Sequence, residues 1–259
     1  MILPLLPERE QKPRSKGIVM MMDKGLSLEE VKNIIQVGGH LIDYAKLGFG
    51  TSMVSNNVKE KVKLYRDSGI KVFLGGTLFE AFLIRDRIHD YEKLIDEFGV
   101  DAVEISDGSM KMYHPKKCDY ISHFSNKRIV LSEVGAKEAD VMTDHNEWIH
   151  HMAKELDAGS SFVIGEARES GTVGIYTKSG CADDSLIKDI LKQIPSEKIM
   201  WEAPLKNQQV WFIKLLGYNV NLGNIAPYDI IPLETLRLGL RGDTFFDFLP
   251  PDFDKFKLS

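Results

Sequence analysis

The chain has few of the features that define several large protein classes. It contains only two cysteines in 259 residues, Cys118 and Cys181, which are too few for a framework of disulfide bonds. No apolar stretch approaches the 18 residues of a transmembrane helix, and the first ten residues are too interrupted by proline and charge for a signal peptide. These absences predict a cytoplasmic protein that has no membrane partner.

The chain also lacks an excess of positive charge. Its 33 lysines and arginines stand against 38 acidic residues, so the formal net charge is −5 at pH 7. Proteins whose main partner is nucleic acid usually present a basic surface, and we therefore expect no nucleic-acid partner. We find no Walker loop, catalytic-triad elbow or zinc-ligand spacing in the sequence. The chemistry must therefore be sought elsewhere in the pattern.

What the chain does contain is an eightfold alternation of short apolar runs and helix-like segments. Each apolar run ends in a polar cluster, and alternating strands and helices are typical of a parallel sheet. The predicted strands are residues 18–22, 42–47, 71–74, 102–105, 129–132, 162–165, 199–201 and 220–222. The predicted helices include one beginning at Ser27, residues 57–68, 78–98, 115–124, 144–157, 184–193 and 206–216, and one with Pro227 in its first turn.

Eight such units in one domain predict a closed (β/α)₈ TIM barrel, which typically takes about 250 residues. The alternative is a doubly wound open sheet, but that fold rarely needs eight units, and no Gly-x-Gly-x-x-Gly follows the first strand. We expect an N-terminal arm over residues 1–16, the barrel over 17–245 and a C-terminal tail over 246–259. A barrel enzyme carries its active site at the carboxyl ends of the strands, where the polar clusters lie.

Four predicted strands end in a glutamate. Alternation of side chains along a strand predicts that Glu104 and Glu202 point toward the barrel axis, whereas the pattern around Glu133 and Glu166 is ambiguous. Converging carboxylates repel one another unless a cation lies among them. One interpretation is a Mg²⁺ site, with Glu104, Glu133 and Glu166 as ligands. The other is that each glutamate pairs with a neighbouring lysine or arginine as part of the scaffold.

Several cations follow the same strands. Lys46 lies near the end of predicted strand two, inside the apolar run 42–47. Lys24 and Lys137 lie in loops after predicted strands one and five, and Arg168 follows strand six. Acids and bases on one rim indicate an anionic substrate. Barrels often bind phosphate after strands seven and eight, and Gly223 and Asn224 would supply free backbone N–H groups at a helix start. The glycine pair before Thr77 could contribute similarly.

At these rim residues the sequence resembles the phosphosulfolactate synthase family, in register from about residue 17 to 245. Ten motifs in order carry the resemblance, which makes it far more specific than any single motif. They are Asp23-Lys24-Gly25, Lys46-Leu47-Gly48-Phe49-Gly50-Thr51-Ser52, Gly75-Gly76-Thr77-Leu78-Phe79-Glu80, Val103-Glu104-Ile105-Ser106-Asp107-Gly108, Glu133-Val134-Gly135, Arg168-Glu169-Ser170-Gly171, Glu202-Ala203-Pro204, Gln208-Gln209-Val210, Val220-Asn221-Leu222, and Leu233-Glu234-Thr235-Leu236-Arg237 through Gly239-Leu240-Arg241-Gly242-Asp243-Thr244-Phe245.

The resemblance implies a (β/α)₈ enzyme that adds sulfite to phosphoenolpyruvate with Mg²⁺, giving (2R)-phospho-3-sulfolactate for coenzyme M or sulfolactate biosynthesis. It also implies a homo-oligomer. The family often shows Glu-Val-Gly-Lys-Lys, whereas this chain has Ala136 before Lys137, which leaves one lysine in that loop. We expect Lys137, and after it Lys46, to be the general acid, and Lys24, Arg168 and the Gly223-Asn224 backbone to bind phosphate.

Two other functions stay open from the sequence. One is a phosphosugar isomerase or an aldolase that uses Lys46 or Lys137 to form a Schiff base. The other is a non-catalytic relative with a regulatory or stress role. Such a relative should have lost its rim charges, whereas this chain keeps nearly all of them.

Overall fold

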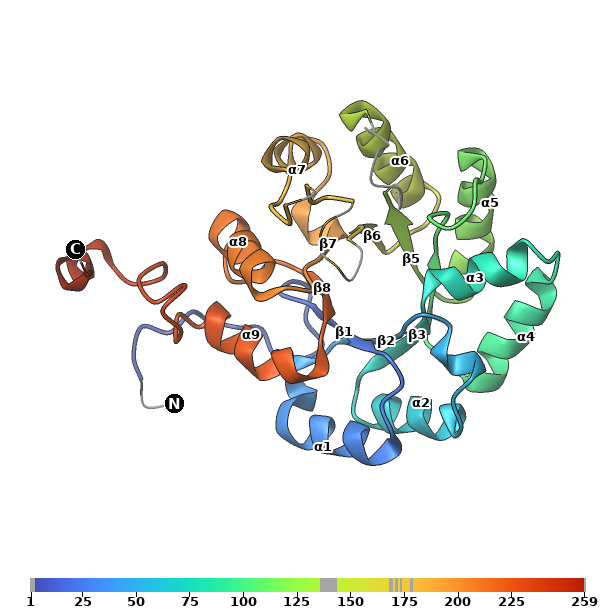
Figure 1. Cartoon of the computed structure of the whole chain (residues 1–259), viewed down its shortest axis with the longest axis horizontal. Helices are drawn as coiled ribbons and strands as arrows, with labels where there is room; N and C mark the ends of the chain where they lie inside the picture. Colours follow the sequence, from blue (N-terminus) through green and yellow to red (C-terminus); the bar gives the residue numbers. More distant parts are fainter. Residues whose placement is uncertain are drawn as a thin grey trace.

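Eight parallel strands form a closed barrel in chain order, which confirms the predicted (β/α)₈ fold. The computed structural model describes residues 3–135, 144–167, 170, 172, 174–177 and 179–258. Figure 1 shows the strands at the centre of a ring of helices. The strands are β1 (Val19–Asp23), β2 (Tyr44–Leu47), β3 (Lys71–Leu74), β4 (Ala102–Ile105), β5 (Ile129–Val134), β6 (Phe162–Gly165), β7 (Ile199–Glu202) and β8 (Leu222–Ile225).

The helices between the strands bury their apolar faces on the outside of the barrel. Local signals mark where several of them begin. The Ser27 hydroxyl accepts a hydrogen bond from the Glu30 amide, and the Glu30 carboxylate accepts one from the Ser27 amide. No described helix is both long and apolar enough to cross a membrane. The helices are α1 (Leu28–Gly38), α2 (Val58–Asp67), α3 (Gly76–Leu83), α4 (Ile88–Phe98), α5 (His114–Ser125), α6 (His145–Asp157), α7 (Asp184–Leu191), α8 (Lys206–Leu216) and α9 (Ile230–Arg237).

Alternate residues of each strand point into the barrel or out toward the helices. Trp201 points outward and stacks on Phe212 of α8, with ring centroids 5.1 Å apart. The inward residues fill the lower barrel with an apolar cluster, as expected for a barrel of this size. Its members are Ile18, Met20, Tyr44, Phe73, Ala102, Leu131, Ile164 and Met200. Two residues further along β2, β4, β5 and β7, the next inward position is charged.

The prediction of one long helix over residues 78–98 is wrong. The segment forms two helices, α3 and α4, and the turn between them includes Asp86 with a φ of 53°. The break lets Phe79 and Phe82 contact Tyr91, with ring centroids 5.8 and 5.7 Å apart. In one straight helix, Phe79 and Tyr91 would lie about 18 Å apart along the axis. Burial of these aromatic rings therefore favours the bend, although no glycine or proline marks it.

The predicted position of the eighth strand is also wrong. The strand lies at Leu222–Ile225, so Gly223 and Asn224 belong to β8, and α9 begins only at Ile230. Pairing with β1 skips a residue, because Val19 pairs with Leu222 and Met21 with Ile225. This irregularity is a β-bulge, which re-aims side chains locally.

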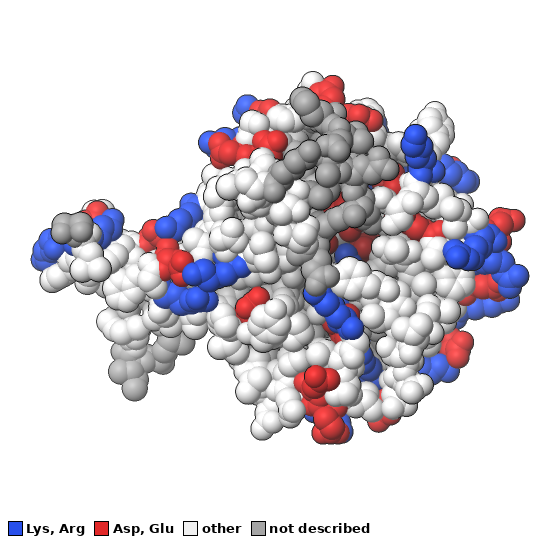
Figure 2. Space-filling model, viewed as in Figure 1, with Lys and Arg blue, Asp and Glu red and all other residues white. Residues whose placement is uncertain are grey.

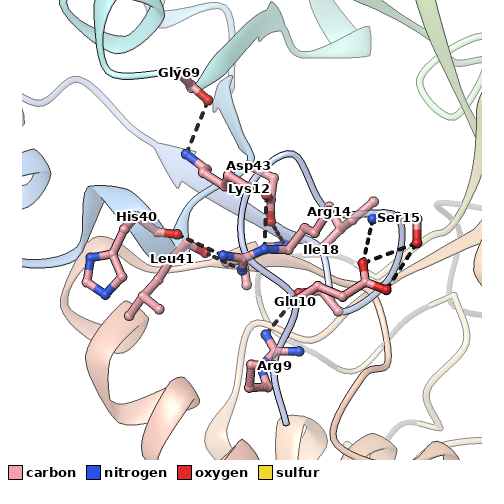
Figure 3. Close-up of polar contacts among 12 residues, drawn as sticks. Arg9, Glu10, Lys12, Arg14, Ser15, Ile18, His40, Leu41, Asp43 and Gly69 are labelled. Carbon is pink, nitrogen blue, oxygen red and sulfur yellow. Dashed lines mark hydrogen bonds and ion pairs between the residues drawn. The ribbon is translucent and has the colours of Figure 1, made fainter. Parts of the chain in front are cut away.

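The segment before β1 packs beneath the barrel through its basic side chains (Figure 3). Lys12 donates hydrogen bonds to the carbonyls of Gly39 and Gly69 at 3.0 and 3.2 Å. Arg14 donates to the carbonyl of His40 at 2.8 Å and pairs with Asp43 at 3.5 Å. These contacts satisfy carbonyls at the amino ends of the strands and their preceding turns, on the face opposite the charged residues.

Residues 245–258 follow the last helix and include a short 3₁₀ helix, Pro251–Phe256. Figure 1 shows this segment leading away from the barrel beyond α9. The 3₁₀ helix contains no buried residue.

Arg9 should contribute most to holding the N-terminal segment. It pairs with Glu234 at 3.0 Å and also contacts Asn219 and the carbonyls of Gly17 and Tyr218. We expect Arg9→Ala to lower the free energy of unfolding by about 2 kcal/mol, since hydrogen bonds to charged groups are the stronger ones. Lys16→Ala is the control, because its exposed pair with Glu10 at 3.9 Å should contribute little. Urea denaturation measures both, and equal effects would contradict the prediction.

Candidate active site

A cavity of about 510 Å³ opens at the carboxyl ends of the strands. Figure 2 shows acidic and basic side chains in a recess near the centre of this face. Each of the eight strands, or the first residue after it, contributes to the lining. These residues are Met22, Lys46, Gly75, Glu104, Glu133, Glu166, Glu202 and Asn224. The arrangement agrees with the position of active sites in this fold.

Lys46 forms the centre of the charged layer. Its Nζ lies 2.8 Å from Glu104 Oε2, 3.3 Å from Glu202 Oε1 and 3.6 Å from Glu133 Oε2. All four side chains are buried. The predicted inward direction of Glu104 and Glu202 is therefore confirmed, and the direction of Glu133, which the sequence left ambiguous, is also inward.

Two of these carboxylates also accept a hydrogen bond from a backbone amide. Gly76, at the start of α3, donates its N–H to Glu104 Oε1 at 2.7 Å. A Cβ atom at Gly76 would lie 2.8 Å from that oxygen and 2.3 Å from Ser106 Oγ, so only glycine allows this approach. The amide of Ala167 donates to Glu202 Oε2 at 2.8 Å. Each carboxylate is thereby oriented toward Lys46.

Burial and mutual repulsion change the pKa values of this layer. The pKa of Glu202 is raised to about 7, chiefly by burial and then by the charges of Glu133 and Glu104, which together outweigh the lowering by Lys46. Burial also raises the pKa of Glu104. Burial alone would lower the pKa of Lys46, but Glu104, Glu202 and Glu133 raise it well above its ordinary value. Lys46 is therefore an ammonium ion at neutral pH.

That protonation state bears on the Schiff-base alternative. A lysine that attacks a carbonyl must lose its proton, and enzymes achieve this by lowering its pKa. The three carboxylates around Lys46 have the opposite effect. The geometry therefore suits Lys46 for ion pairing with negatively charged groups and disfavours Lys46 as a nucleophile.

Lys24 lies at the rim of the cavity. Its Nζ is 5.8 Å from the centre of the Phe49 ring, which also lines the cavity. The preceding residue, Asp23, is buried and accepts hydrogen bonds from the amides of Gly25 and Leu26 at 2.7 and 2.8 Å. Asp23 therefore shapes the loop that carries Lys24 and does not itself line the cavity.

The phosphate subsite predicted at Gly223 and Asn224 needs correction. Because both residues lie within β8, neither is at a helix start. Gly223 faces the apolar interior, where a Cβ would lie 2.4 Å from Met20 Cε. The bulge turns Asn224 into the cavity, with a φ of 55°. Its side-chain Nδ2 donates to the Ala167 carbonyl oxygen at 3.4 Å, and its buried Oδ1 accepts no hydrogen bond from the described residues.

Lys137 and Arg168 lie outside the described residues, and their predicted roles stay predictions. Glu166 lines the cavity, as Glu133 does. Sequence reasoning did not single out Gly76 as a carboxylate anchor, although the glycine pair that contains it was noticed. It also missed Lys117, which contacts the Glu133 backbone from outside the barrel. A lysine on a helix is usually solvated, so no signal in the sequence marked it.

A Mg²⁺ ion in the cavity would need ligands besides the described carboxylates. Among the described residues, no group of three or more histidine, cysteine or acidic side chains is placed to hold a metal ion together. Glu104 is engaged by Gly76 and Lys46. Glu133 of β5 and Glu166, the first residue after the neighbouring strand β6, both line the cavity. Mg²⁺ often takes one or two carboxylates and completes its shell with water and substrate oxygens, and this pair suits such a site.

A closed (β/α)₈ barrel with a buried charged layer at the carboxyl ends of its strands defines a TIM-barrel enzyme. Solved structures share the fold. A 3-hexulose-6-phosphate synthase from Salmonella typhimurium aligns with a TM-score of 0.52 and 14% identity, over 89% of this chain and 94% of that one. The YdjI aldolase from Escherichia coli K12 aligns with a TM-score of 0.56 and 9% identity, over 83% and 76%. Identities this low show the fold alone.

Sequence comparison identifies the family. The model of the (2R)-phospho-3-sulfolactate synthase (ComA) family matches residues 7–243. Phosphosulfolactate synthase from Bacillus subtilis (strain 168) is 40% identical over 244 residues, covering 93% of this chain and 97% of the relative. The Methanocaldococcus jannaschii enzyme of the same name is 41% identical over 236 residues, covering 89% and 94%. The chain belongs to the phosphosulfolactate synthase family and is an enzyme of this kind.

A more distant relative is the plant protein HEAT-STRESS-ASSOCIATED 32 from Arabidopsis thaliana. It is 22% identical over 261 residues, covering 89% of this chain and 88% of the relative. The identity to the synthases is therefore roughly twice the identity to this plant protein.

The crowded carboxylates should make stability depend on pH. The pKa of Glu202 is about 7 in the folded protein, above its usual 4.5. The folded state therefore binds this proton more tightly than the unfolded state, and the free energy of unfolding falls as pH rises from about 4.5 to about 7. Glu202→Gln removes this loss, so the variant should gain more in Tm over wild type at pH 8 than at pH 5. Thermal unfolding at both pH values, with the exposed Glu97→Gln as control, measures the difference, and an equal gain at both would contradict it.

Proposed function

We propose that this enzyme forms phosphosulfolactate by adding sulfite to phosphoenolpyruvate, with Mg²⁺ as cofactor. Membership of the phosphosulfolactate synthase family carries the proposal. In sulfite addition, the sulfur lone pair attacks the methylene carbon of phosphoenolpyruvate. The electrons of the double bond move toward C2 and the carboxylate, and a proton then adds at C2. The phosphate ester stays intact, and all atoms of both reactants are kept in the product.

The charge of the cavity supports a requirement for a divalent cation. Its described lining contains two lysines, Lys24 and Lys46, but four glutamates, Glu104, Glu133, Glu166 and Glu202. Both proposed substrates are anions, so these side chains alone would repel them. Glu133 and Glu166 would hold Mg²⁺ together with substrate oxygens. The bound ion would stabilise the negative charge that develops on the substrate carboxylate.

The chain's own residues divide the remaining work. Lys46, kept protonated by its three carboxylates, would attract the negatively charged groups of the substrates in the cavity. Its raised pKa makes it a poor proton donor, which favours Lys137 as the general acid at C2. Lys24 at the rim, the amide of Asn224 and Arg168 are the candidates for phosphate contacts. The cytoplasmic location and the homo-oligomer remain predictions from the sequence.

The reaction itself is tested directly. Purified protein mixed with phosphoenolpyruvate, sulfite and Mg²⁺ should produce phosphosulfolactate, which ³¹P NMR detects as a new phosphate ester. EDTA should stop turnover, and excess Mg²⁺ should restore it. No new ester with Mg²⁺ present would contradict the proposed reaction, whereas turnover that persists in EDTA would contradict only the metal requirement.

Lys137 can be tested separately as the proton donor. We expect Lys137→Ala to lower kcat by about 10²- to 10⁴-fold, the usual contribution of a positioned acid or base. Exposed Lys63→Ala is the control and should keep wild-type turnover. An unchanged kcat would remove Lys137 from the mechanism. Covalent trapping of a sugar phosphate on the wild-type enzyme by borohydride, through its aldehyde or ketone group, would instead favour the Schiff-base alternative.

A further inference from the structure

A buried lysine outside the cavity contacts the backbone of the active-site strand β5. Lys117 lies on α5 and is 1% exposed. Its Nζ donates to the carbonyl oxygen of Glu133 at 2.6 Å and to Asp107 Oδ1 at 2.9 Å, and it pairs with Glu155 Oε1 at 2.8 Å. An ammonium group has three protons, so these three contacts satisfy it.

The position of Lys117 is unfavourable for helix formation alone. It is the fourth residue of α5, where the positive end of the helix dipole disfavours a cation. Taking an ammonium ion out of water adds a large desolvation cost. Its partner Glu155, on α6, is fully buried as well. A solvated lysine side chain would avoid both costs. The contacts that Lys117 makes with β5, Asp107 and Glu155 therefore explain why a lysine is buried at this position.

These contacts join two segments that border the cavity. Glu133 belongs to β5, and its side chain lies in the cavity 3.6 Å from Lys46. Asp107 follows β4 in the loop that also contains Ser109, which lines the cavity. Glu80 of α3 holds the same loop by accepting hydrogen bonds from Ser106 Oγ and from the Ser109 amide. Lys117 therefore fixes the end of β5 against the loop after β4.

The described contacts of Glu133 differ from those of its two neighbours. Glu104 and Glu202 each accept a hydrogen bond from a backbone amide at 2.7 and 2.8 Å and lie closer to Lys46 than Glu133 does. The Glu133 backbone is held at its carbonyl by Lys117, on the side of the sheet away from the cavity. A shift of about 1 Å in a reacting group can cost about 100-fold in rate.

We propose that Lys117 is a positioning residue that holds the Glu133 side chain in its active orientation through the Glu133 backbone. This inference rests on the proposed function, in which Glu133 serves the reaction in the cavity. Lys117 itself touches no substrate. Glu155 balances its charge, and Asp107 connects it to the loop after β4.

The test replaces the buried pair as a unit. Removing Lys117 alone would take the ammonium group away from the buried Glu155 carboxylate and leave it the His114 ring at 3.3 Å. Breaking a buried ion pair in this way is strongly destabilising, whereas replacing both partners with apolar residues of similar volume is often neutral. We expect Lys117→Met combined with Glu155→Leu to fold and to lower kcat/KM for phosphoenolpyruvate by about 10- to 100-fold. Lys116→Met, an exposed neighbour on α5, is the matched control and should keep wild-type kinetics.

A double-mutant cycle with Glu133→Gln separates positioning from a general structural role. If Lys117 acts through Glu133, adding the pair replacement to Glu133→Gln should lower kcat/KM by less than about threefold more, because the group being positioned is already altered. The same 10- to 100-fold loss in both backgrounds would overturn the inference. So would a folded pair variant with wild-type kcat/KM.

Failure of the pair variant to fold and absence of the proposed reaction have different consequences. If the pair variant does not fold, Lys117→Gln with Glu155→Gln keeps a neutral hydrogen-bonding pair, and the same cycle decides. If wild-type protein shows no sulfite addition to phosphoenolpyruvate, the proposed function fails. If Glu133→Gln is as active as wild type, the inference is overturned because Glu133 has no role for Lys117 to support.

Discussion

The ion cluster around Lys46 is the interaction on which the rest of the site depends. One ammonium group shares a buried layer with Glu104, Glu133 and Glu202, all within 4 Å of its Nζ. Without the lysine, three carboxylates would repel one another in a medium that solvates them poorly. Without the carboxylates, a buried amine would lose its proton. Each charge therefore exists in this barrel because the others do.

Apolar side chains in place of this charged cluster would stabilise the barrel more. Below it, the barrel interior is packed with apolar side chains such as Met20, Phe73 and Leu131. Continuing that pattern would avoid the cost of burying charge. The raised pKa values of Glu104 and Glu202 record the cost. Proteins keep such local conflicts mainly at functional sites, and this charged layer lines the candidate active site.

The sequence predicted strand and helix positions well where they depend on residues that are neighbours in the chain. Strands β3, β4 and β6 lie where alternation and flanking turns placed them, and so does helix α8. The inward direction of Glu104 and Glu202 followed from the twofold repeat of a strand. The break between α3 and α4 did not follow, because packing of Phe79 and Phe82 on Tyr91 causes it and leaves no local signal. The β8 bulge depends on register with β1, which lies about 200 residues away in the chain.

By itself, the sequence determined the barrel, the face that carries the chemistry and the kinds of residue gathered there, because strand and helix periods are local properties. The motifs that resemble the phosphosulfolactate synthases were also readable without a structure. Only the tertiary structure decided that Lys46 lies among three carboxylates, that Asn224 and not a helix start faces the cavity, and that Lys117 holds the Glu133 backbone. Those contacts join residues of different elements, and distance in space between them is set by closure of the barrel and not by spacing along the chain.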